Sequence, residues 1–211
     1  MKQIIFDNKH RQKHFEFFKS MNHPHFNICA NVDITNFMTI LKENNLPFTY
    51  SIVYAIARTA KEIKEFRWRI IDGALYECEN VTPSFTTYTE VADVFSFCDV
   101  VYQDDYADFI KKAAAKAALM NKNPTFEDAD RQDYLFLSSI PWVSFTGLQH
   151  AMPYHPTDSM PRMTWGKYFE EHGKIKMPLS VQVHHALVDG RHIGQYFKKF
   201  ETLLNKFEAV L

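Results

Sequence analysis

The sequence contains little glycine, and this argues against the common phosphate-binding loops. Only 6 of its 211 residues are glycine, below the roughly 7% that is average for proteins. Neither G-x-G-x-x-G nor G-x-x-x-x-G-K-[ST] occurs, and these are the motifs whose backbone amides bind phosphate groups. We therefore expect neither a Rossmann fold nor a P-loop fold.

Cysteine is also scarce. The chain has three, at Cys29, Cys78 and Cys98, an odd number without C-x-x-C spacing. Disulfide frameworks use an even number of cysteines, and zinc ribbons use closely spaced pairs. We expect three buried thiols, with neither a disulfide framework nor a cysteine-based metal site.

An excess of charge and long apolar runs are absent too. Lys plus Arg is 24 and Asp plus Glu is 25, for a net charge of −1, which argues against a nucleic-acid surface made of clustered positive charge. No apolar stretch approaches the ~20 residues of a membrane span. Asp7 and Lys9 precede any apolar run long enough for a signal peptide. The expectation is a cytoplasmic protein without membrane or nucleic-acid partners.

The composition that is present fits a globular domain. Hydrophobic residues make up 46% of the chain and charged residues 23%, both ordinary for folded proteins. At about 150 residues per domain, the length favours a single domain over residues 1–211. Phenylalanine is abundant, with 19 copies, and so many rings can serve a core, a subunit interface or an apolar ligand pocket.

Hydrophobic periodicity predicts both strands and helices. Period two from Phe26 to Ile34 indicates a strand, while spacing of three and four over 49–63 and 192–207 indicates two packed helices. Asp72-Gly73 between apolar runs predicts a β-hairpin. Further helices are expected over 11–19, after Thr35 and over 104–120, and further strands over 84–91, 135–145 and 179–188.

The order of these signals favours one fold class. Strands and helices alternate irregularly and a hairpin is present, so a purely parallel doubly wound sheet is disfavoured. The prediction is an α/β two-layer sandwich, in which a mixed β-sheet carries helices packed mainly on one face.

The segment Val181–Gly190 contains the strongest chemical signal. His184 and His185 end a predicted strand, and Asp189-Gly190 opens the last helix. Imidazole titrates near neutral pH, so one histidine facing a cleft could remove a proton from a hydroxyl or thiol, a role worth ~10²–10⁴ in rate. Two structural histidines are the alternative. A metal site of His184, His185, Asp189 and His192 is a third possibility, disfavoured because adjacent strand residues point to opposite faces.

The pattern His184-His185-x-x-x-Asp189-Gly190 resembles the H-H-x-x-x-D-G signature of CoA-dependent acyltransferases. Further segments along nearly the whole chain are similar to the chloramphenicol acetyltransferase family. These segments are Arg11-x-x-His14-Phe15-Glu16-Phe17-Phe18, Val32-Asp33-Ile34-Thr35, Phe66-Arg67, Ile71-Asp72-Gly73, Pro141-Trp142-Val143-Ser144-Phe145, Gly166-Lys167-Tyr168 and Met177-Pro178-Leu179-Ser180-Val181-Gln182-Val183. The resemblance implies a CoA-dependent acyltransferase-like version of the predicted sandwich.

The resemblance also implies a mechanism, namely direct acetyl transfer from acetyl-CoA to an alcohol without an acyl-enzyme. His185 would be the general base that deprotonates the acceptor hydroxyl. Ser138 would stabilise the oxyanion, a role typically worth ~2.7–4 kcal/mol, and Thr164 would hold a water near it. Asp189 would pair with Arg11 and shape the site.

Other positions are implied to bind the two substrates. Tyr168 and Lys167 match positions beside the coenzyme, and Phe17 and Phe18 match the aromatic side of the acceptor pocket. Leu148 and His150 stand where relatives have apolar pocket residues. Pro47, Thr49 and Trp68 also depart from the family pattern, the first two at expected coenzyme contacts. No metal is expected.

The implied function is acetylation of the primary hydroxyl of chloramphenicol, which confers antibiotic resistance. The family precedent is a homotrimer whose active sites lie at subunit interfaces. Three alternatives stay open: the same chemistry on another alcohol or amine, a ligand-binding relative without turnover, and a metal-binding module.

Overall fold

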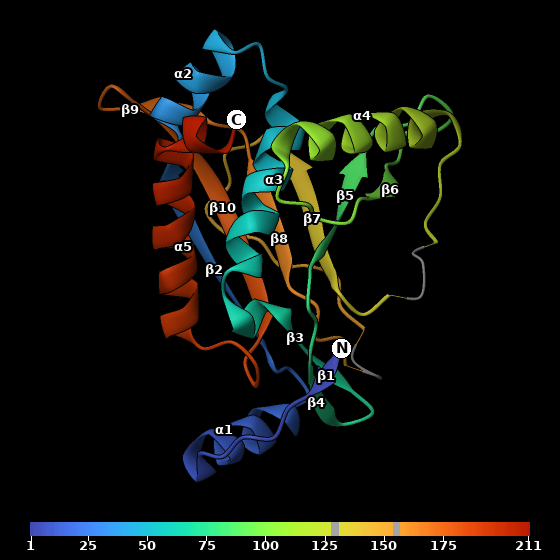
Figure 1. Cartoon of the computed structure of the whole chain (residues 1–211), viewed down its shortest axis with the longest axis vertical. Coiled ribbons are helices and arrows are strands. Elements are labelled where there is room, and N and C mark those ends of the chain that lie inside the picture. Colours follow the sequence, from blue (N-terminus) through green and yellow to red (C-terminus); the bar gives the residue numbers. More distant parts are fainter. Residues whose placement is uncertain (128–130, 154–156) are drawn as a thin grey trace.

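A seven-stranded sheet forms one layer of the molecule and helices form the other (Figure 1). The computed structural model describes residues 1–127, 131–153 and 157–211. The sheet order is β2-β10-β8-β7-β5-β6, with β9 paired to β10. These strands are β2 (His25–Asp33), β5 (Thr82–Thr87), β6 (Ser96–Asp99), β7 (Tyr134–Ile140), β8 (Arg162–Gly166), β9 (Phe169–Glu171) and β10 (Lys174–His184).

The sheet is mixed, as predicted. β7 runs parallel to both of its neighbours, β5 and β8. The pairs β10 with β2, β10 with β8, β10 with β9 and β5 with β6 are antiparallel. A smaller sheet joins β1 (Lys2–Gln3), β4 (Ala74–Glu77) and β3 (Trp68–Ile71). Its expected hairpin is present, since Asp72 and Gly73 have φ of 49° and 75°, as a tight hairpin turn of the primed type requires.

The principal helices cover one face of the sheet. Figure 1 shows α3 (Phe48–Lys61), α4 (Tyr106–Lys122) and α5 (Gly190–Asn205) in front of the strands. α2 (Thr35–Glu43) and the short η2 (Phe207–Val210) lie near one end of α5, and η1 (Lys64–Arg67) follows α3. α1 (Lys9–Lys19) lies apart from this layer, near the end of the sheet where β10 finishes. No helix in the described part of the chain is long and apolar enough to cross a membrane.

The two faces of the sheet differ in chemistry because side chains alternate along a strand. Leu137 on β7 and Val181 and Val183 on β10 are buried in the core with the apolar side of α3. Burying one such side chain stabilises the fold by about 1.5–3 kcal/mol. The opposite face presents polar residues, among them Ser138 and Thr164. The apolar face therefore builds the core and leaves the polar face for a site.

Several expected boundaries are wrong. The strand expected over 135–145 ends at Ile140 and the strand over 84–91 ends at Thr87. The strand expected over 179–188 starts earlier, at Lys174, and ends at His184, whose carbonyl accepts hydrogen bonds from the backbone N–H groups of Leu187 and Val188 in a turn. The short strands β6, β8 and β9 were not predicted from the periodicity.

The cysteines are free thiols, but they are not all buried. Cys78 and Cys98 are buried, whereas Cys29 on β2 is only partly buried. Burial raises the pKa of Cys98 to about 12, so this thiol is protonated and unreactive at neutral pH.

Candidate active site

His185 stands just beyond the end of β10, where aromatic rings hold its imidazole. The ring stacks on Phe18 of α1, with centroids 3.9 Å apart and planes at 20°. The ring centroid of Phe26, on β2, lies 4.5 Å from that of His185, and the ring centroid of His14, on α1, lies 5.5 Å from it. The backbone N–H of His185 donates to the carbonyl of Pro24 at 2.7 Å. The position of the ring is therefore fixed by packing and by its own backbone, with both α1 and β2 contributing.

The imidazole of His185 is not tied up by other polar groups. Its Nδ1 is buried and has no hydrogen-bond partner among the described residues. A histidine that only supports structure usually satisfies its buried nitrogen. Because Nδ1 is enclosed by the protein, the other ring nitrogen, Nε2, is the one that could exchange a proton with a ligand.

His184, the other member of the pair, is structural. Its side chain is buried and its Nδ1 accepts a hydrogen bond from the backbone N–H of Ala186 at 3.2 Å. Burial, with smaller effects of the neighbouring His25 and His185, lowers the pKa of His184 to about 3. The two histidines of the motif thus divide into one that holds the turn and one that faces outward.

Arg11 and Asp189 are both near His185, but the expected ion pair between them is wrong. The guanidinium of Arg11 donates to the carbonyls of Ala186 at 2.9 Å and Leu187 at 2.6 Å. The Asp189 carboxylate caps α5 and accepts from the backbone N–H of Arg191 at 3.1 Å. No ion pair within 4.0 Å joins the two side chains among the described residues. Arg11 holds the turn that follows β10 through these two carbonyls, while the charges of Glu65 and then Asp189 act on it at longer range.

His14 lies between Arg11 and Asp189. The sequence motif Arg11-x-x-His14 contains it but predicts no role for it. Its Nδ1 is 2.6 Å from Nη1 of Arg11, and its Nε2 is 3.9 Å from Oδ2 of Asp189. Burial first, and then the charge of Arg11, lower the pKa of His14, so the ring is neutral at neutral pH. Because arginine only donates, Nδ1 must accept and Nε2 carries the proton.

The four residues considered as metal ligands from the sequence, His184, His185, Asp189 and His192, do not come together in the structure. The ligand atoms of His14, His185 and Asp189 lie within 4.8 Å of one another, whereas His184 and His192 are not in this group. His192 instead accepts a hydrogen bond from the backbone N–H of Asp189 as part of a capping box. The protonated Nε2 of His14 and the adjacent cation of Arg11 both work against a bound metal ion.

Ser138 and Thr164 lie side by side on the polar face of the sheet. They are register partners on the parallel strands β7 and β8, and Thr164 is also opposite Ser180 on β10. Three hydroxyl groups therefore form one row across three strands. Thr164 is 1% exposed and Ser138 is half-buried. The side chain of Thr164 contacts His150, with Oγ1 and Nε2 3.2 Å apart.

The hydroxyl row and His185 are far apart within one chain. Ser180, at the level of the row, precedes His184 by four residues on β10, which corresponds to about 13 Å at roughly 3.3 Å per residue. Ser138 lies two strands further across the sheet, adding about 4.8 Å for each step. A general base and its partners act within about 3 Å of the reacting atoms. One chain alone therefore does not bring His185 to Ser138.

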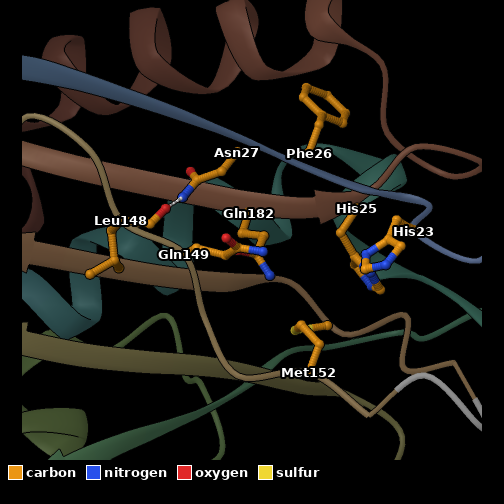
Figure 2. A pocket seen from close by; sticks show the side chains of 8 residues that line it. All are labelled: His23, His25, Phe26, Asn27, Leu148, Gln149, Met152 and Gln182. Carbon is orange, nitrogen blue, oxygen red and sulfur yellow. Dashed lines mark hydrogen bonds between the residues drawn. The ribbon is translucent and has the colours of Figure 1, made fainter.

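A cavity of about 220 Å³ lies on the polar face near the end of β10. Figure 2 shows a loop carrying Leu148, Gln149 and Met152 across the sheet, facing Gln182 of β10. The loop is fastened to β2 where Asn27 donates a hydrogen bond to the carbonyl of Leu148, drawn as a dashed line in Figure 2. Leu148 thus lines a cavity on this face, and its role in binding the acceptor stays a prediction.

Phe26 and His25 of β2 also line this cavity, and Phe26 in turn touches His185. Phe26 is the register partner of the core residue Val183, and Figure 2 shows its ring directed away from the other lining side chains, so His185 itself does not line this cavity. His25 bonds through Nε2 to the carbonyl of Asp158 at 2.6 Å, and burial lowers its pKa.

The remaining predicted binding residues are mostly exposed. Phe17 is 60% exposed, whereas its neighbour Phe18 packs on His185. Tyr168 is 47% exposed and its ring lies 5.9 Å from that of Phe48. Lys167 beside it is exposed, and its backbone N–H donates to the carbonyl of Val143 at 3.0 Å. Tyr168 and Lys167 offer an open aromatic and cationic surface beyond β8.

Gly166 explains how the loop after β7 reaches this surface. A Cβ at this position would lie 2.7 Å from Cγ of Pro178, 2.8 Å from the carbonyl oxygen of Val143 and 2.9 Å from Cδ1 of Phe145. Only glycine allows the loop to approach β8 so closely. The Gly166-Lys167-Tyr168 motif therefore has a structural basis as well as a proposed binding role.

Comparisons with known proteins agree with this geometry. The family described as chloramphenicol acetyltransferase matches residues 1–201. Proteins named chloramphenicol acetyltransferase from Escherichia coli and Acinetobacter baumannii are 31% identical over 201 residues, covering 95% of this chain and 92% of theirs. One from Bacillus pumilus is 31% identical over 202 residues, with the same coverage.

Solved structures give the same assignment at the level of the fold. A chloramphenicol acetyltransferase superposes with a TM-score of 0.84 and 26% identity, covering 97% of this chain and 100% of its own. A dihydrolipoamide acetyltransferase of Azotobacter vinelandii shares the fold, with a TM-score of 0.69 and 18% identity over 94% of this chain and 88% of its own. The predicted fold class is thus confirmed. With the His184-His185-x-x-x-Asp189-Gly190 motif in place at the end of β10, the chain belongs to the chloramphenicol acetyltransferase family.

Proposed function

We propose that this protein transfers the acetyl group of acetyl-CoA to the primary hydroxyl of chloramphenicol and thereby confers resistance to the drug. The family match along residues 1–201 supports the reaction. The observation that carries the proposal is His185 of the family motif, whose half-buried imidazole is packed against the rings of Phe18 and Phe26 with its Nδ1 free of hydrogen bonds to the described residues. The reaction would take place in the cytoplasm, where acetyl-CoA is available.

In the proposed mechanism both substrates are bound at once and no acyl-enzyme forms. His185 accepts the proton of the acceptor hydroxyl while the hydroxyl oxygen attacks the thioester carbonyl carbon. The tetrahedral intermediate carries its negative charge on the former carbonyl oxygen, and the hydroxyl of Ser138 donates a hydrogen bond to that oxygen. The intermediate then collapses, the carbon–sulfur bond breaks, and the departing thiolate takes the proton from His185. The enzyme returns to its initial state.

We place the complete site between two copies of the chain in a homotrimer. His185 from one subunit would face the Ser138 and Thr164 row of its neighbour. The separation of these groups within one chain supports this arrangement, since the base must lie within hydrogen-bond reach of the acceptor. Phe17, exposed in the single chain, would then be covered by the neighbouring subunit or by the acceptor.

Acetyl-CoA is the proposed co-substrate, and the surface of Tyr168 and Lys167 would bind its nucleotide end. An exposed ring can cover adenine, and an ammonium can approach a phosphate. Asp189 and Arg11 would act through the turn after β10, because they fix its backbone on both sides of Val188. No metal ion has a role in this mechanism.

The acceptor side includes Leu148 and Phe18, which are apolar, and His150, which is not. A polar His150 supports a second candidate function, in which the same transfer takes place to a different alcohol or amine. Burial lowers the pKa of His150 to about 4, so the ring is neutral, and with Nε2 bonded to Thr164 it has Nδ1 left for a polar acceptor.

The test is release of the CoA thiol from acetyl-CoA by the purified protein, with and without chloramphenicol. The proposal predicts release that depends on chloramphenicol, together with acetylated drug detected by mass spectrometry. Release that requires another alcohol or amine would favour the second candidate. No release with any acceptor would identify a ligand-binding relative. His185→Ala, purified in parallel, controls for contaminating activity.

A further inference from the structure

His150 lies in a loop that is fastened to the polar face of the sheet. Its backbone N–H donates to Oε1 of Gln182 at 3.2 Å, and Gln182 is 4% exposed. Two residues earlier, the carbonyl of Leu148 accepts a hydrogen bond from Asn27, whose amide also bonds Oγ of Ser180 at 2.8 Å. The backbone from Leu148 to His150 is thus fixed by polar side chains of β2 and β10.

The side chain of His150 is turned toward the hydroxyl row. Its Nε2 lies 3.2 Å from Oγ1 of Thr164. Thr164 is 1% exposed, and His150 is the partner of its hydroxyl among the hydrogen bonds of the described residues. A buried hydroxyl without a partner would cost free energy, so this contact decides how the Thr164 hydroxyl is oriented.

The electrostatic surroundings keep this histidine neutral. Burial first, and then the charge of Arg162, lower the pKa of His150. A neutral imidazole has one nitrogen that accepts and one that donates. If Nε2 accepts, the Thr164 proton points to His150 and the lone pairs of Oγ1 point into the site. A water that donates one hydrogen to Oγ1 then has its second hydrogen available for the oxyanion.

We propose that His150 is a positioning residue for acetyl transfer, which orients the hydroxyl of Thr164 by accepting its hydrogen bond at Nε2. This inference rests on the proposed function, extended by the role that the family resemblance implies for Thr164, which is to hold a water at the oxyanion. His150 does not touch the reacting atoms in this role. His150 sets the direction from which Oγ1 of Thr164 can accept a hydrogen bond from the water.

The experiment compares His150→Leu, which removes the acceptor, with His150→Gln, whose Oε1 can replace it. His150→Leu should lower kcat about tenfold, the effect expected for one hydrogen bond used in the transition state, with the KM for acetyl-CoA unchanged. His150→Gln should recover most of the loss. Thr164→Val should lower kcat to a similar extent, and the double variant His150→Leu with Thr164→Val should be no slower than either single variant.

Three results would overturn the inference while leaving the proposed function intact: unchanged kcat in His150→Leu, equal loss in both His150 variants, or losses that multiply in the double variant. An inactive parent protein would instead remove the proposed function and the inference together. Should His150→Leu fail to fold, ¹⁵N chemical shifts of the His150 ring in the parent decide the matter. The proton should be found on Nδ1, and a proton on Nε2 would refute the assigned direction.

Discussion

The two halves of the proposed site are built by different kinds of interaction. His185 is held by ring packing with Phe18 and Phe26, while its Nδ1 makes no hydrogen bond among the described residues. Ser138 and Thr164 are held by strand pairing in register, and the Thr164 hydroxyl has a defined partner. A base must gain and lose a proton, so packing without hydrogen bonds suits it. The hydrogen-bond donors at an oxyanion must stay in place during the reaction, and the pairing of β7 with β8 fixes Ser138 and Thr164.

Removing the base should have the largest effect. His185→Ala should lower kcat by about 10²–10⁴, the usual contribution of a general base, while the protein stays folded and loses only the ring's packing on Phe18 and Phe26. The measurement is thiol release at saturating substrates, paired with thermal unfolding. His184→Asn serves as the matched control, because its amide can still accept from Ala186. Normal turnover in His185→Ala would remove the base assignment.

Removing the oxyanion donor should have the next largest effect. Ser138→Ala should lower kcat by about 10²–10³ with little change in KM, since the hydrogen bond strengthens only as negative charge develops. Single-turnover acetyl transfer measures this directly. A change confined to KM would place Ser138 in substrate binding instead.

Mixing these two inactive variants tests whether the halves come from different subunits. If each site takes His185 from one chain and Ser138 from its neighbour, random co-assembly should restore both residues in about a quarter of all sites, and in about one of the three sites of each mixed trimer. Co-expression with two affinity tags, followed by tandem purification and an activity assay, would measure this recovery. Activity no higher than that of the separate variants would show that both residues serve one chain's own site.

The turn after β10 should respond to Arg11. Arg11→Lys keeps the positive charge but replaces the planar fork that bonds the carbonyls of Ala186 and Leu187. Losing one charge-assisted hydrogen bond to a half-buried group should cost about 1–2 kcal/mol in the free energy of unfolding. Activity should fall with it, because the turn positions His185. Urea unfolding of the parent and of Arg11→Lys measures the difference. An unchanged midpoint would mean that the turn does not depend on the guanidinium of Arg11.

The elements with strong periodicity could be predicted from the sequence, whereas the site was only partly accessible. The alternation from Phe26 and the apolar spacing after Thr49 identify β2 and α3, although Ile28 of β2 is exposed and α3 is buried at nearly every position from Ser51 to Ala60. The end of β7 was misjudged, since Trp142 and Val143 are apolar yet 65% and 53% exposed. Exposed apolar residues on a loop imitate a strand in composition.

The contacts within the site depend on tertiary structure that no local pattern encodes. The motif identified His185 as the base but did not predict the structural role of His184, whose Nδ1 accepts a hydrogen bond from the backbone N–H of Ala186. The pairing of Arg11 with Asp189 failed because backbone carbonyls of the turn compete for the guanidinium. His150 was assigned to the acceptor pocket, and its bond to Thr164 becomes visible only when the loop is folded onto the sheet.

The last expected effect is on the pH dependence of stability, and it comes from the two buried histidines, His184 and His150. The pKa of His184 is about 3 and that of His150 about 4 in the folded protein, both below the ordinary value near 6.5. The unfolded chain therefore binds more protons between about pH 6.5 and 4, and stability falls as the pH is lowered through that range, by at most about 1.4 kcal/mol per pH unit for each histidine. Thermal unfolding of the parent and of His184→Asn between pH 7 and 4.5 measures this. The variant should lose stability less steeply, and parallel curves would mean that His184 is not the group that resists protonation.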